Sequence, residues 1–459
     1  MELTEMTEAG KAEADDKIAS LRPGGQTNLW DGLHTGLECL AASNEPSRCS
    51  AAMLLTDGLP NIVPPRGHVP MLQRWKESNP MNCSISTFGF GYNLDGTLLR
   101  DIATEGQGMF SFVPDANFVG TCFVNTTSNI LATCGRRAVL TVSNNDDEKW
   151  GEALQAAGVQ PCLGNSSTFA SWGVQMPIGT LQAGQSKDIV LRLPGAAPPS
   201  LFVSLDYVPS GATEEMKVTA ETSSPTDPND VDVAGATEAS VQRARLAFVE
   251  AGQAALVAMG ANNDDEARDV VARVAGLIRS DAAACADERV QKLLEDVEGQ
   301  VTEAISRRDW FNKWGKHYLL SLTQAHRLQS CSNFKDPGVQ VYGGELFRGL
   351  RDTADNIFLK LPAPVPATPV RTPNYGAAGR GGRGRGRGAG AAPAAAPVSR
   401  PVDMSRFMNA GAPCFHGDSQ VAMEDGSSKA CAAVRQGDRV ACGGVGNGIS
   451  SARVKCVIK

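Results

Sequence analysis

Two short segments near the amino end constrain this chain most: GGQTNLWDGL at residues 24–33 and MLLTDGLPN at residues 53–61. In the first, Thr27 precedes apolar residues at helical spacing, and in the second, Asp57 follows the apolar run AAMLL. Taken alone, Thr27 could be the N-cap of a helix, and Asp57-Gly58 could form an ordinary turn after a strand. Their occurrence together, in this order and spacing, favours a functional pair.

The surrounding region, residues 1–135, alternates between helical and strand-like patterns. Strand-like runs at residues 51–55, 83–88 and 109–113 are separated by segments of helical periodicity. Such alternation predicts a parallel, doubly wound sheet. Open sheets of this kind bind ligands at the carboxyl ends of their strands, where Asp57 is expected to lie.

The two segments resemble two of the three metal-binding loops of a von Willebrand factor type A domain, and residues 83–115 resemble its later part. In that family a divalent ion, usually Mg²⁺, lies at the top of the parallel sheet and binds an acidic group of a partner protein. The resemblance implies that Thr27 and Asp57 are metal ligands. The family's first loop, Asp-x-Ser-x-Ser, does not occur in residues 1–26. We therefore expect a partial type A domain without its first strands, whose metal-dependent adhesion-type site is incomplete and binds little or no metal.

Composition excludes several other classes of protein. A net charge of −7 argues against nucleic-acid binding by the whole surface. No apolar run approaches the ~18 residues that a membrane span needs, and the charged first residues lack a signal-peptide core. The 12 cysteines form no C-x-x-C pair, which argues against zinc ribbons and RING domains. We expect an intracellular, cytoplasmic protein with reduced cysteines, and a chain of this length predicts several domains.

Residues 136–222 change to a period of two. Large aliphatic residues stand at every second position in two runs: Leu201, Val203 and Leu205 in one, and Ile189, Leu191 and Leu193 in the other. Segments rich in Gly and Pro separate the runs. This pattern predicts a small antiparallel β-sandwich. The segment contains no cluster of His, Asp or Cys, so we expect a structural spacer.

Helical periodicity returns over residues 236–360, after a polar linker. Three apolar stripes predict a helical bundle: Val241, Ala244, Phe248, Ala251 and Ala255; Val270, Val274, Leu277 and Ile278; Val290, Leu293, Leu294, Val297, Val301 and Ile305. Residues 313–347 resemble the Vwaint region found behind type A domains in some eukaryotic proteins. His317 and His326 are nine residues apart and face opposite sides of a straight helix, so we interpret them as core or surface residues and not as ligands.

Residues 361–402 are predicted to be a Pro/Ala-rich and Arg-Gly-rich linker. Its four arginines, Arg380, Arg383, Arg385 and Arg387, are of a type that binds RNA phosphates. Without interleaved aromatic residues, a solvated linker is the better interpretation.

Residues 412–459 resemble the beginning of a Hint domain, the self-processing module of inteins and Hedgehog proteins. The resemblance lies in Cys414, in Val421 and Met423, and in the segments Asp425-Gly426 and Gly437–Val440. It implies that Cys414 is the nucleophile that attacks the carbonyl of Pro413, with a downstream His in a Thr-x-x-His element as general acid. That His is lacking, since the last His is His416. We therefore expect Cys414 to be inactive here and the chain to be an internal part of a longer protein.

Three functions remain open from the sequence. The first is a non-catalytic protein that binds other proteins through its type A domain and Vwaint region. The second is an autoprocessing protein that cleaves or splices its own backbone through Cys414. The third is an adaptor in ubiquitin transfer, because similar type A regions occur in plant ubiquitin ligases, although RING cysteines are absent here.

Overall fold

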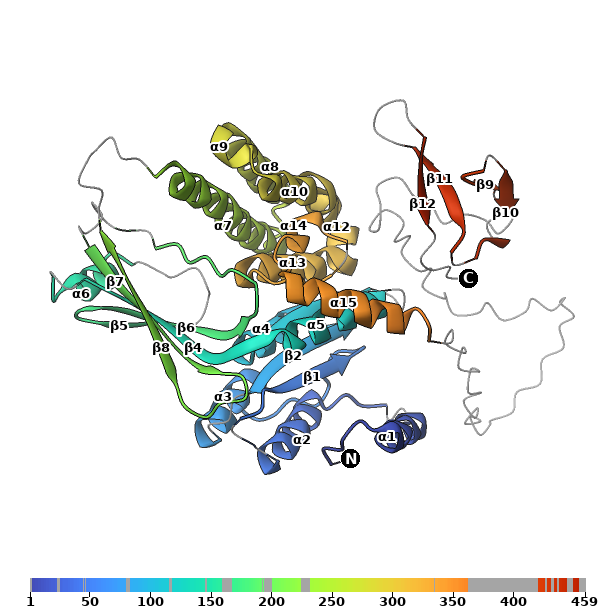
Figure 1. Cartoon of the computed structure of the whole chain (residues 1–459), viewed down its shortest axis with the longest axis horizontal. Coiled ribbons are helices and arrows are strands. Elements are labelled where there is room, and N and C mark those ends of the chain that lie inside the picture. Colours follow the sequence, from blue (N-terminus) through green and yellow to red (C-terminus); the bar gives the residue numbers. More distant parts are fainter. Residues whose placement is uncertain are drawn as a thin grey trace, which may run out of the picture. The chain divides into compact units, whose positions relative to one another are not determined.

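The computed structural model describes residues 2–361, with gaps at 23–24, 44, 46, 80–82, 115–117, 145–146, 159–166, 192, 194–199, 224–231 and 334. It also describes residues 420–453, with gaps at 426, 431–432, 436 and 444–448. The chain divides into two compact units, residues 1–356 and 357–459 (Figure 1). None of the helices in these ranges has both the length and the apolar character needed to cross a membrane.

The amino-terminal part is a three-stranded parallel sheet with helices. Its elements are α1 (Glu8–Ser20), α2 (Leu29–Ala42), β1 (Ser50–Thr56), α3 (His68–Ser78), β2 (Cys83–Phe90), α4 (Gly96–Glu105), β3 (Gln107–Val113) and α5 (Val119–Leu131). The strands pair in parallel in the order β1-β2-β3. This is the parallel α/β arrangement that the alternation of strand and helix predicts.

The two edges of this sheet differ. At the β3 edge, the backbone amide of Phe110 donates to Gln324 Oε1 at 2.8 Å, and its carbonyl accepts from Ser321 Oγ at 3.1 Å. Both side chains come from α13 (Lys316–Leu328), which therefore covers this edge. The β1 edge has no paired strand in the described part of the chain. Leu55, on this apolar strand, is 48% exposed, whereas the middle of β2 is buried.

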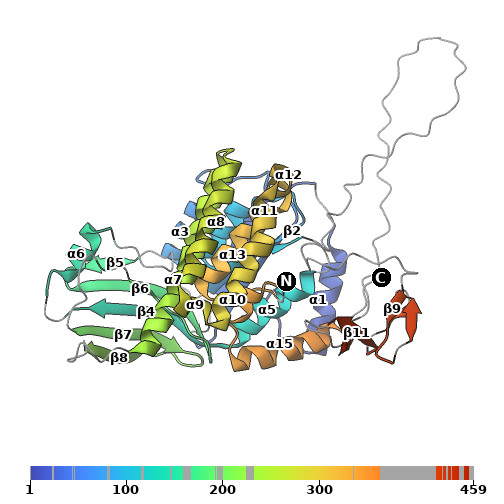
Figure 2. The ribbon, with the colours of Figure 1, turned by 90° about the horizontal axis from the view of Figure 1, so that it is seen from above.

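The next part is a five-stranded antiparallel sheet in the order β5-β6-β4-β7-β8. Its elements are β4 (Thr133–Ser143), α6 (Trp150–Ala156), β5 (Thr168–Ala170), β6 (Gly173–Gln182), β7 (Ser200–Pro209) and β8 (Met216–Ser223). The five strands lie side by side in Figure 2.

The predicted β-sandwich is therefore wrong, because the described strands of this region form one sheet. Trp150 and Leu154 of α6 form a core with sheet residues such as Val142 and Met176. Ile189, Leu191 and Leu193 pack against this core from a segment without strand structure, instead of forming the expected strand. A helix and this irregular segment thus cover the apolar face of the sheet, where we expected a second sheet.

The third part is helical. It contains α7 (Val233–Gly260), α8 (Asp264–Ser280), α9 (Ala282–Cys285), α10 (Glu288–Asp296), α11 (Thr302–Ser306), α12 (Arg308–Trp310), α13, α14 (Pro337–Gln340) and α15 (Glu345–Phe358), with π-helical turns at Val297–Val301 and Phe311–Gly315. The residues of the first and third predicted stripes are buried. In the second stripe Val274 and Ile278 are buried, but Leu277 is 62% exposed, because it lies one residue, or 100° around the helix, from Ile278.

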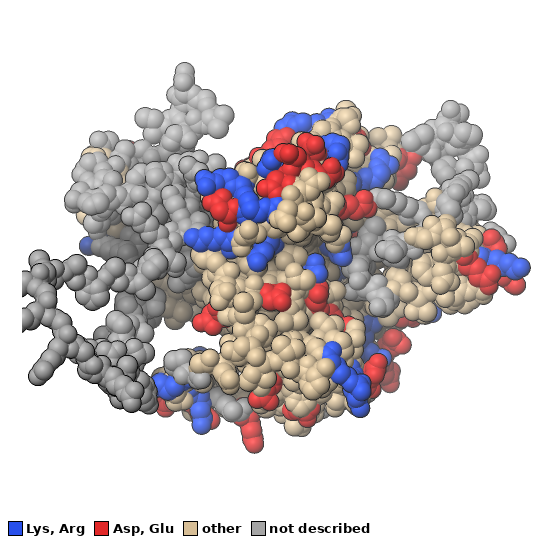
Figure 3. All heavy atoms as spheres, turned by 180° about the vertical axis from the view of Figure 1, so that it is seen from behind, with Lys and Arg blue, Asp and Glu red and all other residues tan. Residues whose placement is uncertain are grey.

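The outer surface of these helices carries mixed charge. Arg279 pairs with Glu298 at 2.6 Å and Arg273 with Glu266 at 3.1 Å. In Figure 3, basic and acidic atoms lie interleaved at the top of the view, where α8 and α10 are found. Since the charges alternate in sign, this surface is a solvated face without a patch of one sign.

The carboxy-terminal unit has two short antiparallel strand pairs. β9 (Gln420–Ala422) pairs with β10 (Ser428–Ala430), and β11 (Arg439–Gly443) pairs with β12 (Ile449–Arg453). Among the described residues of this unit, a bridge between Met423 and Val440 connects the two pairs.

Candidate functional site

Thr27 lies directly before α2 but does not cap it. The N-cap is Asn28, whose side-chain oxygen accepts a hydrogen bond from the amide of Asp31 at 3.2 Å. The hydroxyl of Thr27 has no hydrogen-bond partner among the described residues. The simple explanation of Thr27 as a helix cap therefore does not hold.

The Thr27 loop is joined to the loop that follows β1. Asn61 Oδ1 accepts from the amide of Thr27 at 2.8 Å, and the amide of Asn61 donates to the carbonyl of Thr27 at 3.1 Å. A Cβ atom placed on Gly58 would lie 3.6 Å from Thr27 Oγ1. The structure thus brings Thr27 next to the turn that contains Asp57. We did not single out Asn61 from the sequence, although it lies in the quoted segment at residues 53–61.

Asp57 lies at the carboxyl end of β1, as the α/β pattern predicts. The Thr56 hydroxyl donates to the carbonyl of Gly58 at 3.1 Å and so orders a tight turn around it. The Asp57 side chain is exposed and makes no hydrogen bond or ion pair within the described chain. This geometry agrees with an ordinary turn after the strand. The turn also leaves the Asp57 carboxylate available to a ligand.

These residues fit a divalent cation only in part. The Thr27 hydroxyl and the Asp57 carboxylate are hard oxygen donors of the kind that Mg²⁺ prefers, and neither is engaged elsewhere in the described chain. Asn61 Oδ1 is already used by the amide of Thr27. The described residues hold no group of three or more His, Cys, Asp or Glu arranged for a metal. Two protein oxygens do not complete the octahedron of Mg²⁺.

Exposed apolar side chains lie at the end of β1 and in the loop that follows it. Leu59 and Val63 are 48% and 61% exposed, Ile62 is 37% exposed, and Leu55 of β1 is near them in sequence. The amide of Ile62 donates to the carbonyl of Thr27 at 3.4 Å, which places this loop against Thr27. We call Leu55, Leu59, Ile62 and Val63 the apolar rim. Grouped exposed apolar residues are typical of interaction surfaces.

The two histidines of the helical region lie apart in the core. The His317 ring packs 5.4 Å from that of Phe112, and burial lowers its pKa to about 4. His326 packs 5.0 Å from Phe248, with its Nδ1 2.8 Å from the Tyr342 hydroxyl, and burial lowers its pKa to about 3. Their positions agree with the interpretation of core residues.

Two buried carboxylates lie in the same region. Asp336 accepts from the Tyr318 hydroxyl at 3.1 Å and from Asn333 Nδ2 at 2.8 Å, and Asp296 accepts from the amide of Gly338 at 2.8 Å. Burial raises the pKa of Asp336 to about 6, and burial together with Asp336 raises that of Asp296. Asn333 Oδ1 also accepts from the amide of Asp336 at 2.9 Å, so these residues order the loop before α14.

The other candidate residues are Cys414 and the four linker arginines, Arg380, Arg383, Arg385 and Arg387. All of them lie outside the described residues.

Comparison with known proteins identifies the helical region. Residues 287–356 match the family model Vwaint, described as VWA / Hh protein intein-like. The chain therefore carries a Vwaint region, which confirms the prediction made from residues 313–347. The comparison with curated proteins found no match.

Two solved structures are similar to this chain. One is the von Willebrand factor type A protein from Catenulispora acidiphila, with 16% identity over 73% of this chain and 76% of that chain and a TM-score of 0.49. The other is the ArnB paralog VWA2 from Sulfolobus acidocaldarius, with 17% identity over 64% of this chain and 71% of that chain and a TM-score of 0.33.

Proposed function

We propose that this chain is a non-catalytic protein-binding protein of the type A kind, which binds its partner at the carboxyl end of β1. The binding surface consists of the apolar rim with Thr27 and Asp57 beside it. The proposal rests mainly on one observation. Asn61 joins the two loops, and the Thr27 hydroxyl and the Asp57 carboxylate are left unpaired in the described chain.

The chemistry of this surface indicates the kind of partner. The apolar rim favours an apolar segment, because burying such side chains stabilises a complex by about 25 cal/mol per Å² of apolar surface. Within the proposal, Thr27 and Asp57 are parts of a metal-dependent site that binds an acidic side chain of the partner. Since two protein oxygens complete no such site, binding by this chain depends mainly on the apolar rim.

Affinity capture with matched variants tests the proposal. The wild-type chain, Val63→Ser and Leu277→Ser are used as bait in extracts of cells that express the chain. Val63 and Leu277 are similarly exposed, at 61% and 62%, but only Val63 belongs to the apolar rim. We expect a partner that is retained by the wild type and by Leu277→Ser and depleted at least about tenfold by Val63→Ser.

The captured partner is then purified and titrated against each variant. Equal affinity for all three chains contradicts the proposal, because it places the binding surface elsewhere. Thermal denaturation of the variants excludes a loss of binding through unfolding. Repeating the titration with Mg²⁺ and with a chelator measures what the metal contributes.

A further inference from the structure

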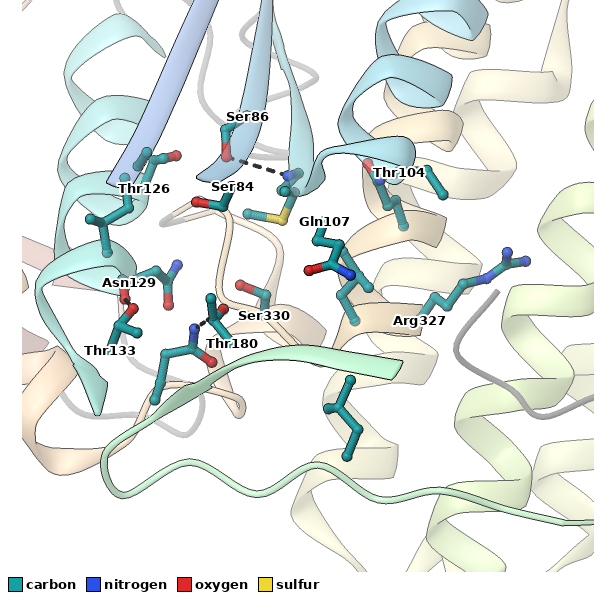
Figure 4. A pocket seen from close by; sticks show the side chains of 18 of the residues that line it. Ser84, Ser86, Thr104, Gln107, Thr126, Asn129, Thr133, Thr180, Arg327 and Ser330 are labelled. Carbon is teal, nitrogen blue, oxygen red and sulfur yellow. Dashed lines mark hydrogen bonds between the residues drawn. The ribbon is translucent and has the colours of Figure 1, made fainter. Parts of the chain in front are cut away.

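A cavity of about 310 Å³ lies at the opposite end of the parallel sheet. Ser50 of β1, Ser84 of β2 and Gln107 of β3 line it, and these residues stand at the amino ends of their strands. The five-stranded sheet and α13 line it from the other sides, through residues such as Thr180 and Arg327 (Figure 4). Its volume lies at the lower end of the range of small-molecule sites.

The wall of the cavity is rich in hydroxyl and amide groups. Figure 4 shows Ser84, Thr126, Asn129 and Gln107 gathered around the same space. Thr126 is only 3% exposed, and its hydroxyl has no hydrogen-bond partner in the described structure. A buried hydroxyl without a partner costs about 1–3 kcal/mol, so a ligand that bonds to this group is favoured.

Gln107 adds a second feature of the wall. Its backbone has a φ of 54°, in the left-handed region that a residue with a side chain adopts at a cost. Its side chain points into the cavity (Figure 4) and makes no hydrogen bond with the described residues.

The cavity carries positive charge although the whole chain is acidic. Arg100 and Asp101 both line it and pair with each other at 2.6 Å. Arg136, which is 3% exposed, donates to the carbonyls of Arg48 and Ala212 and contacts no carboxylate in the described chain. Peptide carbonyls bind the guanidinium without neutralising it.

Lys187 is the second cation without a carboxylate partner in the described structure. It belongs to an irregular segment, yet its neighbour Asp188 is held firmly. Gln329 donates to the carbonyl of Asp188 at 2.9 Å and accepts from its amide at 3.0 Å. The buried Arg245 donates to the same carbonyl at 2.9 Å. These bonds fix the backbone from which the Lys187 side chain reaches the cavity.

Burial lowers the pKa of the Lys187 amine to about 8. The Lys187 side chain is half-buried. A partly desolvated ammonium normally has an anionic partner, because removing an unpaired charge from water is costly.

We propose that this cavity binds a small organic anion, whose carboxylate or phosphate pairs with Lys187 and whose hydroxyl or carbonyl groups bond to Thr126 and Gln107. Arg136 adds positive charge to the site. The proposal is independent of the protein-binding function, because Thr27 and Asp57 lie at the other end of the strands.

Calorimetric titration of the full chain at pH 7 tests the proposal with three probes: citrate, glucose 6-phosphate and neutral glucose. We expect saturable one-to-one binding of at least one of the two anions and none of glucose. Preference for citrate identifies a carboxylate site, and preference for glucose 6-phosphate a phosphate site. Lys187→Met should weaken binding at least about tenfold, and Lys187→Arg, which keeps the positive charge, should weaken it less. Thr126→Val removes only the hydroxyl and should also weaken binding.

Lys217→Met is the matched control, because Lys217 is exposed on β8 and should not affect binding. A second readout is the rate of acetylation of Lys187 against pH, followed by mass spectrometry. A bound anion should move the midpoint of this profile upward from about 8. Absence of saturable binding by both anions, or equal affinity of wild type and Lys187→Met, would overturn the proposal.

Discussion

Asn61 forms two hydrogen bonds with the backbone of Thr27, accepting from its amide at 2.8 Å and donating to its carbonyl at 3.1 Å. The two residues are 34 positions apart. Through this pair, the start of α2 is joined to the loop after β1, which carries Leu59, Ile62 and Val63 of the apolar rim and follows directly on Asp57. The predictions below concern this surface, the sheet behind it and the charged groups in the core.

Asn61→Ala should loosen this surface without unfolding the protein. It removes the acceptor of the Thr27 amide, and an exposed hydrogen bond of this kind contributes about 0.5–1.5 kcal/mol. Hydrogen exchange should become faster at Thr27. Asn79→Ala is the control, because the bonds of Asn79 to described residues go to Trp75, four residues earlier, and not to Thr27. Unchanged exchange at Thr27 in Asn61→Ala would show that the loops hold together without this bond.

The chain should bind Mg²⁺ weakly or not at all. Thr27 and Asp57 supply two protein oxygens, and Mg²⁺ held by so few groups keeps most of its water. Isothermal titration calorimetry should therefore detect no tight binding in the wild type or in Asp57→Ala. A stoichiometric, tight site in the wild type that Asp57→Ala removes would refute this prediction.

The two edges of the parallel sheet should differ in hydrogen exchange. The edge of β1 has no described partner, whereas the Phe110 backbone on β3 is bonded to Gln324 and Ser321. We expect amides of β1 to exchange faster than those of β3, and Gln324→Ala to speed up exchange at Phe110. Equal protection of the two strands in the wild type would argue that something covers the β1 edge.

Asp296→Asn should stabilise the protein at neutral pH. The pKa of Asp336 is raised from 3.8 to about 6 and that of Asp296 is also raised, so the folded chain binds more protons than the unfolded chain between about pH 4 and 6. The free energy of unfolding therefore falls as the pH rises through this interval, by about 3 kcal/mol for Asp336 alone.

An Asn at position 296 keeps an acceptor for the amide of Gly338 and removes one charge. Denaturant titrations should show a gain in stability at pH 7 that disappears below about pH 4, where the carboxyl is protonated in both states. Asp309→Asn, on the surface, should show no such dependence. A loss of stability in Asp296→Asn at pH 7 would mean that the carboxylate is needed in its charged form.

Lys187→Met should also stabilise the ligand-free protein. The pKa of this amine is lowered from 10.5 to about 8, so the unfolded chain binds more protons between pH 8 and 10.5. The charged amine therefore costs up to about 3 kcal/mol below pH 8, and this cost disappears as the pH rises toward 10.5. The advantage of Lys187→Met in thermal denaturation should be largest at pH 7 and smaller at pH 9. A constant advantage would point to packing and not to charge.

Local pattern predicted much of this fold because it reports which side chains are buried. The alternation over residues 1–135 predicts β1, β2, β3 and the parallel sheet, and the stripe from Val290 to Ile305 is buried in full. The order and spacing of Thr27 and Asp57 indicate that the two residues act together, and the structure brings their loops together at the carboxyl end of β1. The match over residues 287–356 confirms the Vwaint region.

Tertiary structure alone decided what covers each apolar face and which distant groups meet. The period of two in β7 shows that one face is buried, but not that α6 together with Ile189, Leu191 and Leu193 covers it in place of a second sheet. The cover of the β3 edge comes from Gln324, 214 residues after Phe110. Likewise, Lys187, Thr126 and Gln107 meet only because separate segments close around one cavity. Periodicity depends on neighbours along the chain, whereas such contacts depend on how whole elements pack, so the cavity has no local signal in the sequence.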